Sequence, residues 1–364
     1  MRVATILKPM MLTLLLSFFT PAAMSKTVQV GTCLANVQSY QSISQAVSGV
    51  PAGSTVLVCP GEYAEQVTIT QPLTLRGVQS GNNSNPTITV PQGGLTQSVV
   101  SPVNQITMFF QILILNTGSG LVNIEDLAVN GSSTANAALK GWLPGIYYQN
   151  SSGEVNGVAV YDQIGNGYGF PVFADNTSSV AKTVTVRHSS IHDYDGEGIR
   201  TNGSPTPTLT ITLQSNSVIG SNSGSNPVYN GIDLQGSVGS VLDNFVAIPP
   251  GVVTDGLGIY VTSSTVVSGN TVEGWAIFAG ADSNLIKDNK VSLSDITILG
   301  NENVVQSNLV FNGGGIALGC QASDNTITDN ILNNVDVGIN GGNGSDIVAP
   351  NSISNTPTVV APCS

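Results

Sequence analysis

The segment 187–200 holds the densest group of side chains that could do acid–base or metal chemistry. Only 9% of the chain is charged, yet this segment contains both of its histidines, His188 and His192. Such a concentration, in a chain otherwise poor in charge, is typical of a functional site. The remaining charged members of the segment are Arg187, Asp193, Asp195, Glu197 and Arg200.

Three of these residues, His192, Asp195 and Arg200, are candidates for catalysis. Epimerases and lyases of uronic-acid polymers combine a base near the ring proton with an arginine or a cation on the substrate carboxylate. The sequence alone does not single out the base. The alternative is a tight turn, because the Asp-Gly-Glu-Gly run at 195–198 aligns with the uncharged Asn-Gly-Gly-Gly run at 312–315.

Carboxylates also recur four residues before a repeated aliphatic position, where a turn is expected. Oxygen ligands that converge from neighbouring turns suit Ca²⁺, which takes about six to eight of them. Asp and Asn also favour tight turns without any metal. Ca²⁺ is the only cofactor that the sequence suggests, and its candidate ligands are Asp193, Asp195, Glu197 and Asp255.

A repeating structure must position these residues, because two short signatures recur and interleave along the chain. One is a polar residue, Asn, any residue and an aliphatic, with Asn residues 19 to 28 positions apart. The other is a small residue followed by Val or Ile. The first signature is centred on Asn216, Asn244, Asn270, Asn289, Asn308 and Asn330, and the second has its aliphatic at Val158, Ile199, Ile232, Ile259, Ile277, Ile316 and Ile339.

Repeats of this length, rich in Val, Ile, Thr, Asn and Gly, predict stacked coils of short strands. One such repeat cannot bury an apolar face alone, whereas a stack buries a continuous core. Asn at a fixed point in each coil would form a ladder of amides along the stack. We therefore predict an all-β, single-stranded right-handed parallel β-helix, with a short N-terminal capping helix whose residues Ile43, Ala46 and Val47 share one face.

The repeat also predicts which side chains face outward together. If the recurring aliphatic points inward, the residue after it points outward, and the glycine before it forms a floor on the same surface. The expected outward column reads Ala159, Arg200, Asp233, Tyr260, Phe278, Ala317 and Asn340. A second column, two residues further on, reads Tyr161, Asn202, Gln235, Thr262 and Gly280.

Such a surface is suited to binding a saccharide. Sugars stack on aromatic rings and hydrogen-bond to amides and carboxylates. The alternative is a surface ion pair between Arg200 and Asp233 beside rings covered by a loop. The insertion 131–153, with Trp142, could cover this groove or pack down as a satellite core. The predicted binding residues are Arg200, Asn202, Asp233, Gln235, Tyr260 and Phe278.

The N-terminal residues 1–25 are typical of a secretory signal peptide, with a charged start, an apolar stretch and small residues before the expected cleavage point. Residues 26–364 are then the β-helix domain, with an N-terminal cap at 33–60 and a C-terminal tail at 345–364. We expect a secreted or periplasmic monomer without a membrane span. Four cysteines in an exported chain predict disulfides, with Cys33–Cys59 and Cys320–Cys363 as the favoured pairs among three possible pairings.

The charge balance restricts the partners. Residues 1–25 hold two of the ten basic and none of the 22 acidic residues, so the remainder carries −14. This charge repels nucleic acid and anionic lipid at long range. This charge is compatible with a neutral glycan or a cation as partner, or with an anionic partner bound through a bridging metal ion.

Residues 39–77 resemble the opening of the pectin-lyase-like β-helix superfamily, in the segments SISQAV (42–47), GSTV (53–56), PGEYAE (60–65) and LTLRG (73–77). The Asn-rich coils from 184 to 340 are similar to repeat domains of carbohydrate-binding and sugar-hydrolase proteins. The resemblance implies the fold and a polysaccharide partner. It does not supply catalytic residues, since the active-site segments of methylesterases, polygalacturonases and pectate lyases are all absent.

The predicted function is an exported β-helix protein that binds, and in one version also cleaves or epimerises, a polysaccharide. An enzyme of this kind would be a lyase, an epimerase or a glycoside hydrolase. The alternative is a non-catalytic surface or structural repeat protein. The sequence leaves these alternatives open.

Overall fold

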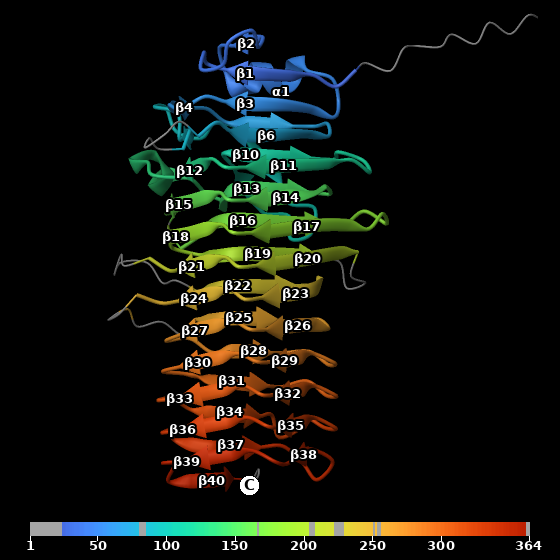
Figure 1. The fold of residues 1–364 in the computed structure, drawn as a ribbon, viewed down its shortest axis with the longest axis vertical. Coiled ribbons are helices and arrows are strands. Elements are labelled where there is room, and N and C mark those ends of the chain that lie inside the picture. The colour runs from blue at the N-terminus through green and yellow to red at the C-terminus, as the bar shows by residue number, and fades with distance from the viewer. Residues whose placement is uncertain are drawn as a thin grey trace, which may run out of the picture.

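The computed structural model describes residues 24–79, 85–165, 167–203, 208–221, 229–249, 252 and 256–361, and the side chains of this set up to 357. Coils of β-strands stack from the N-terminal end to the C-terminal end in one elongated column (Figure 1). A complete coil contributes one strand to each of three sheets, and every pairing within these sheets is parallel. The parallel β-helix predicted from the repeats is therefore confirmed.

The three sheets run the length of the column. Sheet A consists of β1 (Thr27–Val30), β2 (Ser39–Tyr40), β3 (Ser54–Val58), β6 (Leu73–Gly77), β11 (Leu121–Glu125), β14 (Ser152–Asn156), β17 (Lys182–Arg187), β20 (Leu209–Gln214), β23 (Val238–Leu242), β26 (Thr265–Ser268), β29 (Leu285–Lys287), β32 (Val304–Gln306), β35 (Thr326–Thr328) and β38 (Ile347–Val348). Sheet B consists of β4 (Glu62–Ala64), β7 (Thr87–Thr89), β12 (Ala128–Asn130), β15 (Ala159–Gln163), β18 (Ser190–Tyr194), β21 (Ser217–Ile219), β24 (Phe245–Ala247), β27 (Thr271–Glu273), β30 (Lys290–Ser292), β33 (Leu309–Phe311), β36 (Ile331–Asn333) and β39 (Ser352–Ser354). Sheet C consists of β5 (Val67–Ile69), β10 (Ile112–Leu115), β13 (Leu143–Gln149), β16 (Gly169–Asn176), β19 (Glu197–Gly203), β22 (Asn230–Gln235), β25 (Leu257–Val261), β28 (Ile277–Ala279), β31 (Asp295–Ile298), β34 (Gly315–Leu318), β37 (Val337–Gly341) and β40 (Thr358–Ala361).

Aliphatic side chains from all three sheets point into the column and form one continuous core. In sheet C, Ile199 pairs in register with Ile232, Ile232 with Ile259, and Ile259 with Ile277, and all four are buried. Because side chains alternate across a strand, this register turns the following residues outward. The predicted sequence Arg200, Asp233, Tyr260 and Phe278 along the outer face is therefore confirmed as a structural column.

The predicted column needs two corrections, one at its N-terminal end and one within it. Ala159 and Tyr161 lie on β15 of sheet B, and the residue that pairs with Arg200 from the preceding coil is Phe173. Thr297 of β31 lies between Phe278 and Ala317. The small-plus-aliphatic signature led to the first error because it also occurs at a sheet B strand. The second arose because Asp295, rather than a small residue, precedes Ile296.

The predicted glycine floor is also wrong. A Cβ on Gly198 would lie 2.6 Å from Val218 Cγ1, and one on Gly231 would lie 2.4 Å from Val246 Cγ1, so both glycines face the core. The following isoleucines face the core too. The alternation is therefore interrupted at this corner of the coil, and the residue before each glycine turns outward beside the column.

A ladder of buried asparagines stabilises the turn between sheets A and B. Asn289 Nδ2 donates to Val267 O at 2.9 Å and to Asn308 Oδ1 at 3.0 Å, and its Oδ1 accepts from the backbone and side-chain nitrogens of Asn270. The ladder predicted from the sequence is thus present. A second, shorter ladder through Asn284, Asn303 and Asn325 follows the same pattern in the turn before sheet A.

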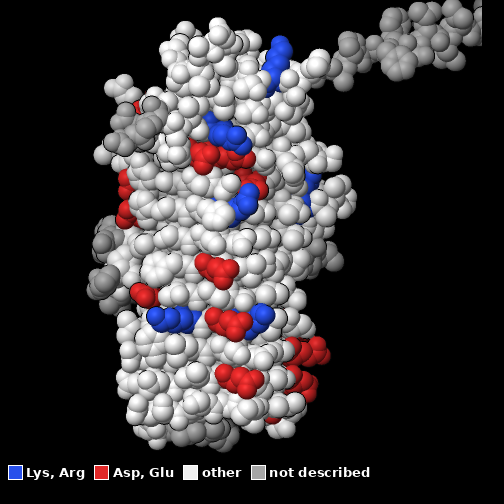
Figure 2. All heavy atoms as spheres, in the orientation of Figure 1, with Lys and Arg blue, Asp and Glu red and all other residues white. Residues whose placement is uncertain are grey.

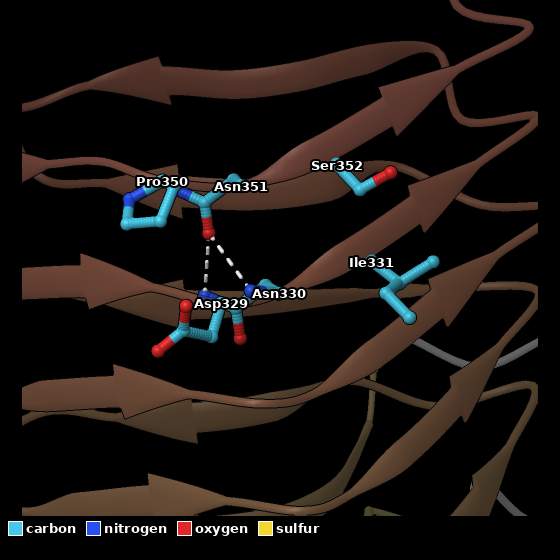
Figure 3. A pocket seen from close by; sticks show the side chains of 6 residues that line it. All are labelled: Asp329, Asn330, Ile331, Pro350, Asn351 and Ser352. Carbon is cyan, nitrogen blue, oxygen red and sulfur yellow. Dashed lines mark hydrogen bonds between the residues drawn. The ribbon is translucent and has the colours of Figure 1, made fainter.

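The last rung of the first ladder borders a hollow at the C-terminal end of the column (Figure 3). There, Asn351 Oδ1 accepts hydrogen bonds from both nitrogens of Asn330. Because the ladder occupies these polar groups, we assign the hollow no functional role.

The N-terminal end is closed by helix α1 (Ile43–Gly49), which is capped by Ser42 and buries Ile43, Ala46 and Val47 as predicted. A disulfide joins Cys33 to Cys59 in the same region, which confirms the first predicted pair. Cys320 is also disulfide-bonded, but Cys363 lies outside the described residues, so the second pairing stays a prediction.

The surface turned to the viewer in Figure 2 is mostly uncharged, and its charged side chains lie in small groups, some mixed and some acidic only. Two ion pairs on the outside of sheet A join neighbouring coils, Arg76 with Glu125 and Arg187 with Glu154. The face seen there carries no continuous basic strip of the kind that binds nucleic acid. Within the described ranges, no helix has the length and apolar character needed to cross a membrane.

Candidate functional site

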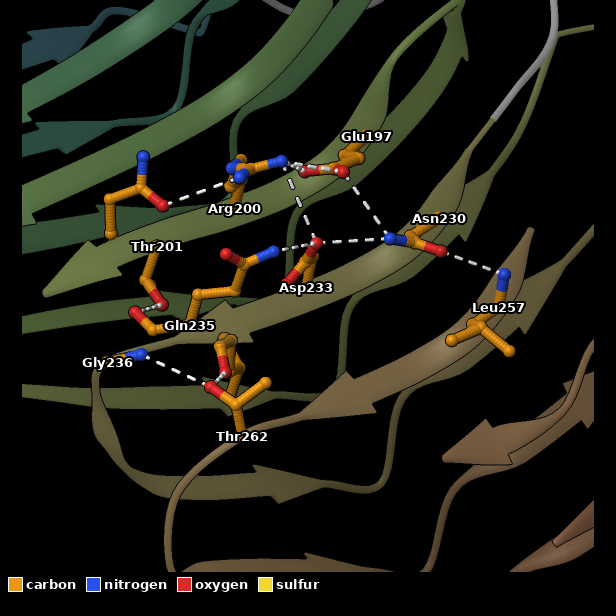
Figure 4. A network of polar contacts seen from close by, with 11 residues as sticks. Glu197, Arg200, Thr201, Asn230, Asp233, Gln235, Gly236, Leu257 and Thr262 are labelled. Atoms are coloured by element: carbon orange, nitrogen blue, oxygen red, sulfur yellow. Dashed lines mark hydrogen bonds and ion pairs between the residues drawn. The ribbon is translucent and has the colours of Figure 1, made fainter. Parts of the chain in front are cut away.

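The outer face of sheet C brings Glu197, Arg200, Asn230, Asp233 and Gln235 together on the adjacent strands β19 and β22 (Figure 4). The inward glycines described above turn Glu197 and Asn230 outward, so each joins the residue three positions later in its own strand. The site therefore combines two carboxyl groups, one guanidinium and two amides on two coils.

Arg200 links the two carboxyl groups. Its Nη1 donates to both oxygens of Glu197, at 2.8 and 2.7 Å, and lies 3.8 Å from Asp233 Oδ2. Asp233 Oδ2 also accepts from Asn230 Nδ2 at 3.1 Å and from Gln235 Nε2 at 3.0 Å. The side chains of Arg200, Glu197 and Asp233 are 14%, 7% and 1% exposed, so these charges are largely removed from water.

Burial changes the acid–base properties of the pair. Burial, reinforced by the neighbouring Asp233, raises the pKa of Glu197 to about 8, although Arg200 opposes the shift. Burial also raises the pKa of Asp233, again against the effect of Arg200. Two buried carboxyl groups beside a single cation cannot both ionise cheaply, so near neutral pH the pair holds one proton.

Two polar atoms in this network have no hydrogen-bond partner among the described residues, Asp233 Oδ1 and Arg200 Nε. Buried polar groups without a partner are uncommon, because each costs about 1–3 kcal/mol of stability. A polar ligand or a bound water would satisfy them. Asp233 Oδ1 can accept one further hydrogen bond, and Arg200 Nε can donate one.

Aromatic side chains border the network on both sides along the column. Trp142 lies against Arg200, with the guanidinium carbon 4.8 Å from the ring centre, and packs on Phe170 at 4.6 Å between ring centres. On the other side, Tyr260 and Phe278 are half-buried and meet edge to face at 5.3 Å. An exposed guanidinium–aromatic contact is worth about 0.5–1 kcal/mol, and a desolvated one more.

Asp195 is not part of this network. It is fully buried, and its oxygens accept hydrogen bonds from the backbone nitrogens of Gly165, Gly167 and Gly169 at 2.7 to 2.9 Å. These bonds hold the chain that leads into β16. The structure therefore supports a positioning role for Asp195 in place of the catalytic role that we predicted.

His192 also lies apart from Arg200. It belongs to β18 of sheet B, where its ring stacks on Tyr161 at 5.2 Å and its Nδ1 lies 2.7 Å from Asp193 Oδ2. The sequence segment that we treated as one cluster thus spans two sheets and the turn between them. Its members face different surfaces, and we leave His192 out of the site.

The described residues contain no group of three or more His, Cys, Asp or Glu side chains arranged to hold a metal ion. Of the Ca²⁺ candidates, Asp193 pairs with His192, Asp195 caps a backbone turn and Glu197 binds Arg200. Asp255 lies outside the described residues. The donor set does not fit Ca²⁺, because amide hydrogens and a guanidinium occupy the carboxylate oxygens that would coordinate it.

Among the predicted binding residues, Arg200, Asp233 and Gln235 are in the network, and Asn202 lies 3.5 Å from Arg200 Nη2. Glu197 was predicted only as a metal ligand, and Asn230 was not predicted at all. Trp142 was identified as a residue that could cover the groove or pack down, and it packs at the edge of a satellite core that includes Tyr147.

Comparison with known proteins gives matches of structure only. No family model matches the sequence, and no curated protein matches it. A GH136 lacto-N-biosidase from Eubacterium ramulus superposes with a TM-score of 0.65 at 12% identity, covering 90% of this chain and 68% of that one. PfbA, a surface adhesin of Streptococcus pneumoniae, superposes with a TM-score of 0.59 at 12% identity, covering 87% of each chain. By its fold, the chain is a right-handed parallel β-helix, which it shares with these two proteins.

Proposed function

We propose that this protein is exported, binds a neutral polysaccharide along the outer face of sheet C, and cleaves it by acid–base chemistry at Glu197 and Asp233. The observation that carries the proposal is the pair of buried carboxyl groups, Glu197 and Asp233, held around Arg200 in line with the rings of Tyr260 and Phe278. Export is supported by the signal-like N-terminus and by the Cys33–Cys59 disulfide.

The geometry favours a saccharide because it alternates ring faces with hydrogen-bonding groups. Successive outward residues lie one strand apart, about 4.8 Å, so Asp233, Tyr260 and Phe278 span a length comparable to two sugar rings. Gln235 and Asn230 supply amides beside them. A structural neighbour is described as a lacto-N-biosidase and another as a surface adhesin, which agrees with a glycan-directed role.

A neutral glycan fits better than a uronic-acid polymer. Arg200, the cation in this network, is already bound to Glu197 and close to Asp233. A substrate carboxylate would have to displace one of them and approach the other. With a net charge of −14 outside residues 1–25, the whole chain also repels a polyanion.

Each carboxyl group has a defined task in the proposed reaction. Glu197, whose pKa is raised to about 8, holds its proton at neutral pH and donates it to the glycosidic oxygen as the bond to the anomeric carbon breaks. Asp233, which is 1% exposed, supplies the carboxylate that meets the anomeric carbon once the substrate displaces Asn230 and Gln235 from it. In a retaining enzyme such a carboxylate bonds to the anomeric carbon, and water releases the sugar in a second step.

The test is incubation with oligosaccharides of neutral β-glucan, xylan, galactan and chitin, with polygalacturonate and alginate as anionic comparisons. We expect new reducing ends from a neutral glycan, with activity lost as pH rises through about 8 because Glu197 loses its proton. Glu197→Gln and Asp233→Asn should each lower the rate at least about a hundredfold. Glu154→Gln, in an ion pair on sheet A, is the matched control.

A second candidate function is binding without cleavage. It is favoured because Arg200, Asn230 and Gln235 already donate hydrogen bonds to oxygens of the two carboxyl groups. In that case the panel yields no new reducing ends, but a glycan still binds. The Tyr260→Ala/Phe278→Ala variant should then weaken binding about tenfold or more, and Phe311→Ala, an aromatic on sheet B, should not.

A further inference from the structure

A hairpin covers the outer face of sheet C on the N-terminal side of the site. Strands β8 (Ser98–Val100) and β9 (Thr107–Phe109) form the only antiparallel pair in the described part of the chain. Hydrogen bonds fix this hairpin to the sheet: Ser101 Oγ donates to Asp175 Oδ2 at 2.7 Å, and Gln149 Nε2 donates to Val100 O at 2.9 Å.

The segment that carries Trp142 belongs to the same cover. Phe109 N donates to Trp142 O at 2.8 Å, and Trp142 N donates to Thr107 O at 2.9 Å. An apolar cluster fills the space between this cover and the sheet, and includes Met108, Phe110, Leu113, Tyr147, Phe170 and Phe173. The cover is therefore packed down as part of the folded molecule.

The burial of successive outward residues marks where the cover ends. Leu113, Tyr147 and Phe173, on β10, β13 and β16, are buried, with Phe173 0% exposed. Arg200, on the next strand, touches Trp142 and is the first outward residue that reaches solvent. Asp233, on the following strand, is 1% exposed because Asn230 and Gln235 enclose it, and Tyr260 and Phe278 beyond it are partly exposed.

We infer that the cover closes the glycan path at one end, so that the site takes the end of a polysaccharide chain. The inference rests on the proposed function. A sugar at Glu197 and Asp233 meets Trp142 on one side, whereas the chain continues over Tyr260 and Phe278 toward the C-terminal coils. The protein then removes terminal units and leaves internal linkages intact.

The experiment measures binding of neutral hexasaccharides of β-1,4-glucan, β-1,4-galactan and chitin to the full chain. Each is used free, with a bulky fluorophore on the reducing end, with a 4,6-O-benzylidene group on the non-reducing end, and with both. We expect a blocking group on one of the two ends, and blocking groups on both ends, to weaken binding at least tenfold. A blocking group on the other end alone should be tolerated. Equal binding of free and doubly blocked hexasaccharides would overturn the inference and leave the proposed function standing. If no free hexasaccharide binds, both fall.

A variant at the edge of the cover gives an independent readout. Trp142→Ala should open space beside Arg200 and reduce the ratio between free and singly blocked hexasaccharide affinities toward one. Leu139→Ala, a partly buried residue of the same segment in a different apolar cluster, should leave that ratio unchanged. The ratio is insensitive to a general loss of folded protein. An unchanged ratio in Trp142→Ala would contradict the inference that the cover closes the glycan path beside Arg200.

Discussion

At the scale of single residues, burial determines which acidic groups can hold a proton at neutral pH. Asp175 shows this apart from the proposed active pair. Burial raises its pKa to about 7, even though hydrogen bonds from Tyr147 and Ser101 favour its charged form. Asp175 lies beneath the hairpin, with its Oδ1 unpartnered among the described residues. It is therefore a carboxyl group whose ionisation opposes folding.

The pH dependence of stability follows from this shift. A carboxyl group whose pKa is higher in the folded than in the unfolded state binds more protons when the protein is folded. Its contribution to the free energy of unfolding therefore falls as the pH rises from its ordinary pKa of 3.8 to about 7. Asp175→Asn should remove a pH-dependent cost of at most about 4 kcal/mol, since one pKa unit corresponds to about 1.4 kcal/mol. Urea unfolding midpoints of both proteins between pH 4 and 8 test this. Parallel slopes would show that Asp175 is not the titrating group.

The sequence could predict the outward column at this scale, but only part of the network. Strand alternation is enough to align Arg200 with Asp233. It does not place Glu197 outward, because that needs two consecutive inward residues, Gly198 and Ile199, at the corner of the coil. Side-chain directions at such a corner depend on the packing of Val218, which belongs to another sheet.

At the scale of the elements, the asparagine ladder makes neighbouring coils depend on one another. Each internal rung accepts two hydrogen bonds from the rung before it and donates two to the rung after it, all within the buried turn. Removing one rung leaves polar groups unsatisfied on its neighbours. Their desolvation costs more than the lost bond itself.

We expect Asn289→Ala to reduce the free energy of unfolding by about 3 kcal/mol, because Asn270 loses an acceptor for two donors. Asn333→Ala, at an exposed strand position, should change it by less than about 0.5 kcal/mol. Urea titrations followed by circular dichroism provide the comparison. Equal losses in the two variants would mean that the ladder is not a main source of stability.

The first ladder could be predicted because it repeats at nearly constant spacing. The second ladder carries the same signature, as in Ser-Asn284-Leu-Ile and Glu-Asn303-Val-Val. It was missed because it has fewer rungs and falls between those of the first. The hairpin cover could not be predicted, because insertions between coils have no repeat to align and their position depends on tertiary contacts such as Ser101 with Asp175.

At the scale of the whole molecule, stability is distributed along the column. Each strand pairs with the strand above and below it, so coils contact mainly their immediate neighbours. The Cys33–Cys59 disulfide lies in the first coils, while Glu197 and Asp233 lie several coils away. Local damage at the N-terminal end should therefore leave the site intact.

A Cys33→Ser/Cys59→Ser variant should lose about 3 kcal/mol of stability, the usual value for a loop of this size. Hydrogen exchange should rise mainly in β1, β2 and α1, and remain unchanged in β19 and β22. Glycan binding at a temperature where the variant is folded should equal that of the parent protein. Faster exchange spread evenly over all coils would contradict independent behaviour along the column.

The coils in this part of the protein are equal in length, because the rungs Asn270, Asn289 and Asn308 lie 19 residues apart. Excision of residues 271–289 would bring Asn308 to the position of Asn289 and keep every later strand in register. The outward column beside the site would become one strand, about 4.8 Å, shorter, because Phe278 would be lost. Duplication of the same stretch would lengthen it. Recombination between equal coils is thus a simple route by which such a chain could change the length of its outward column.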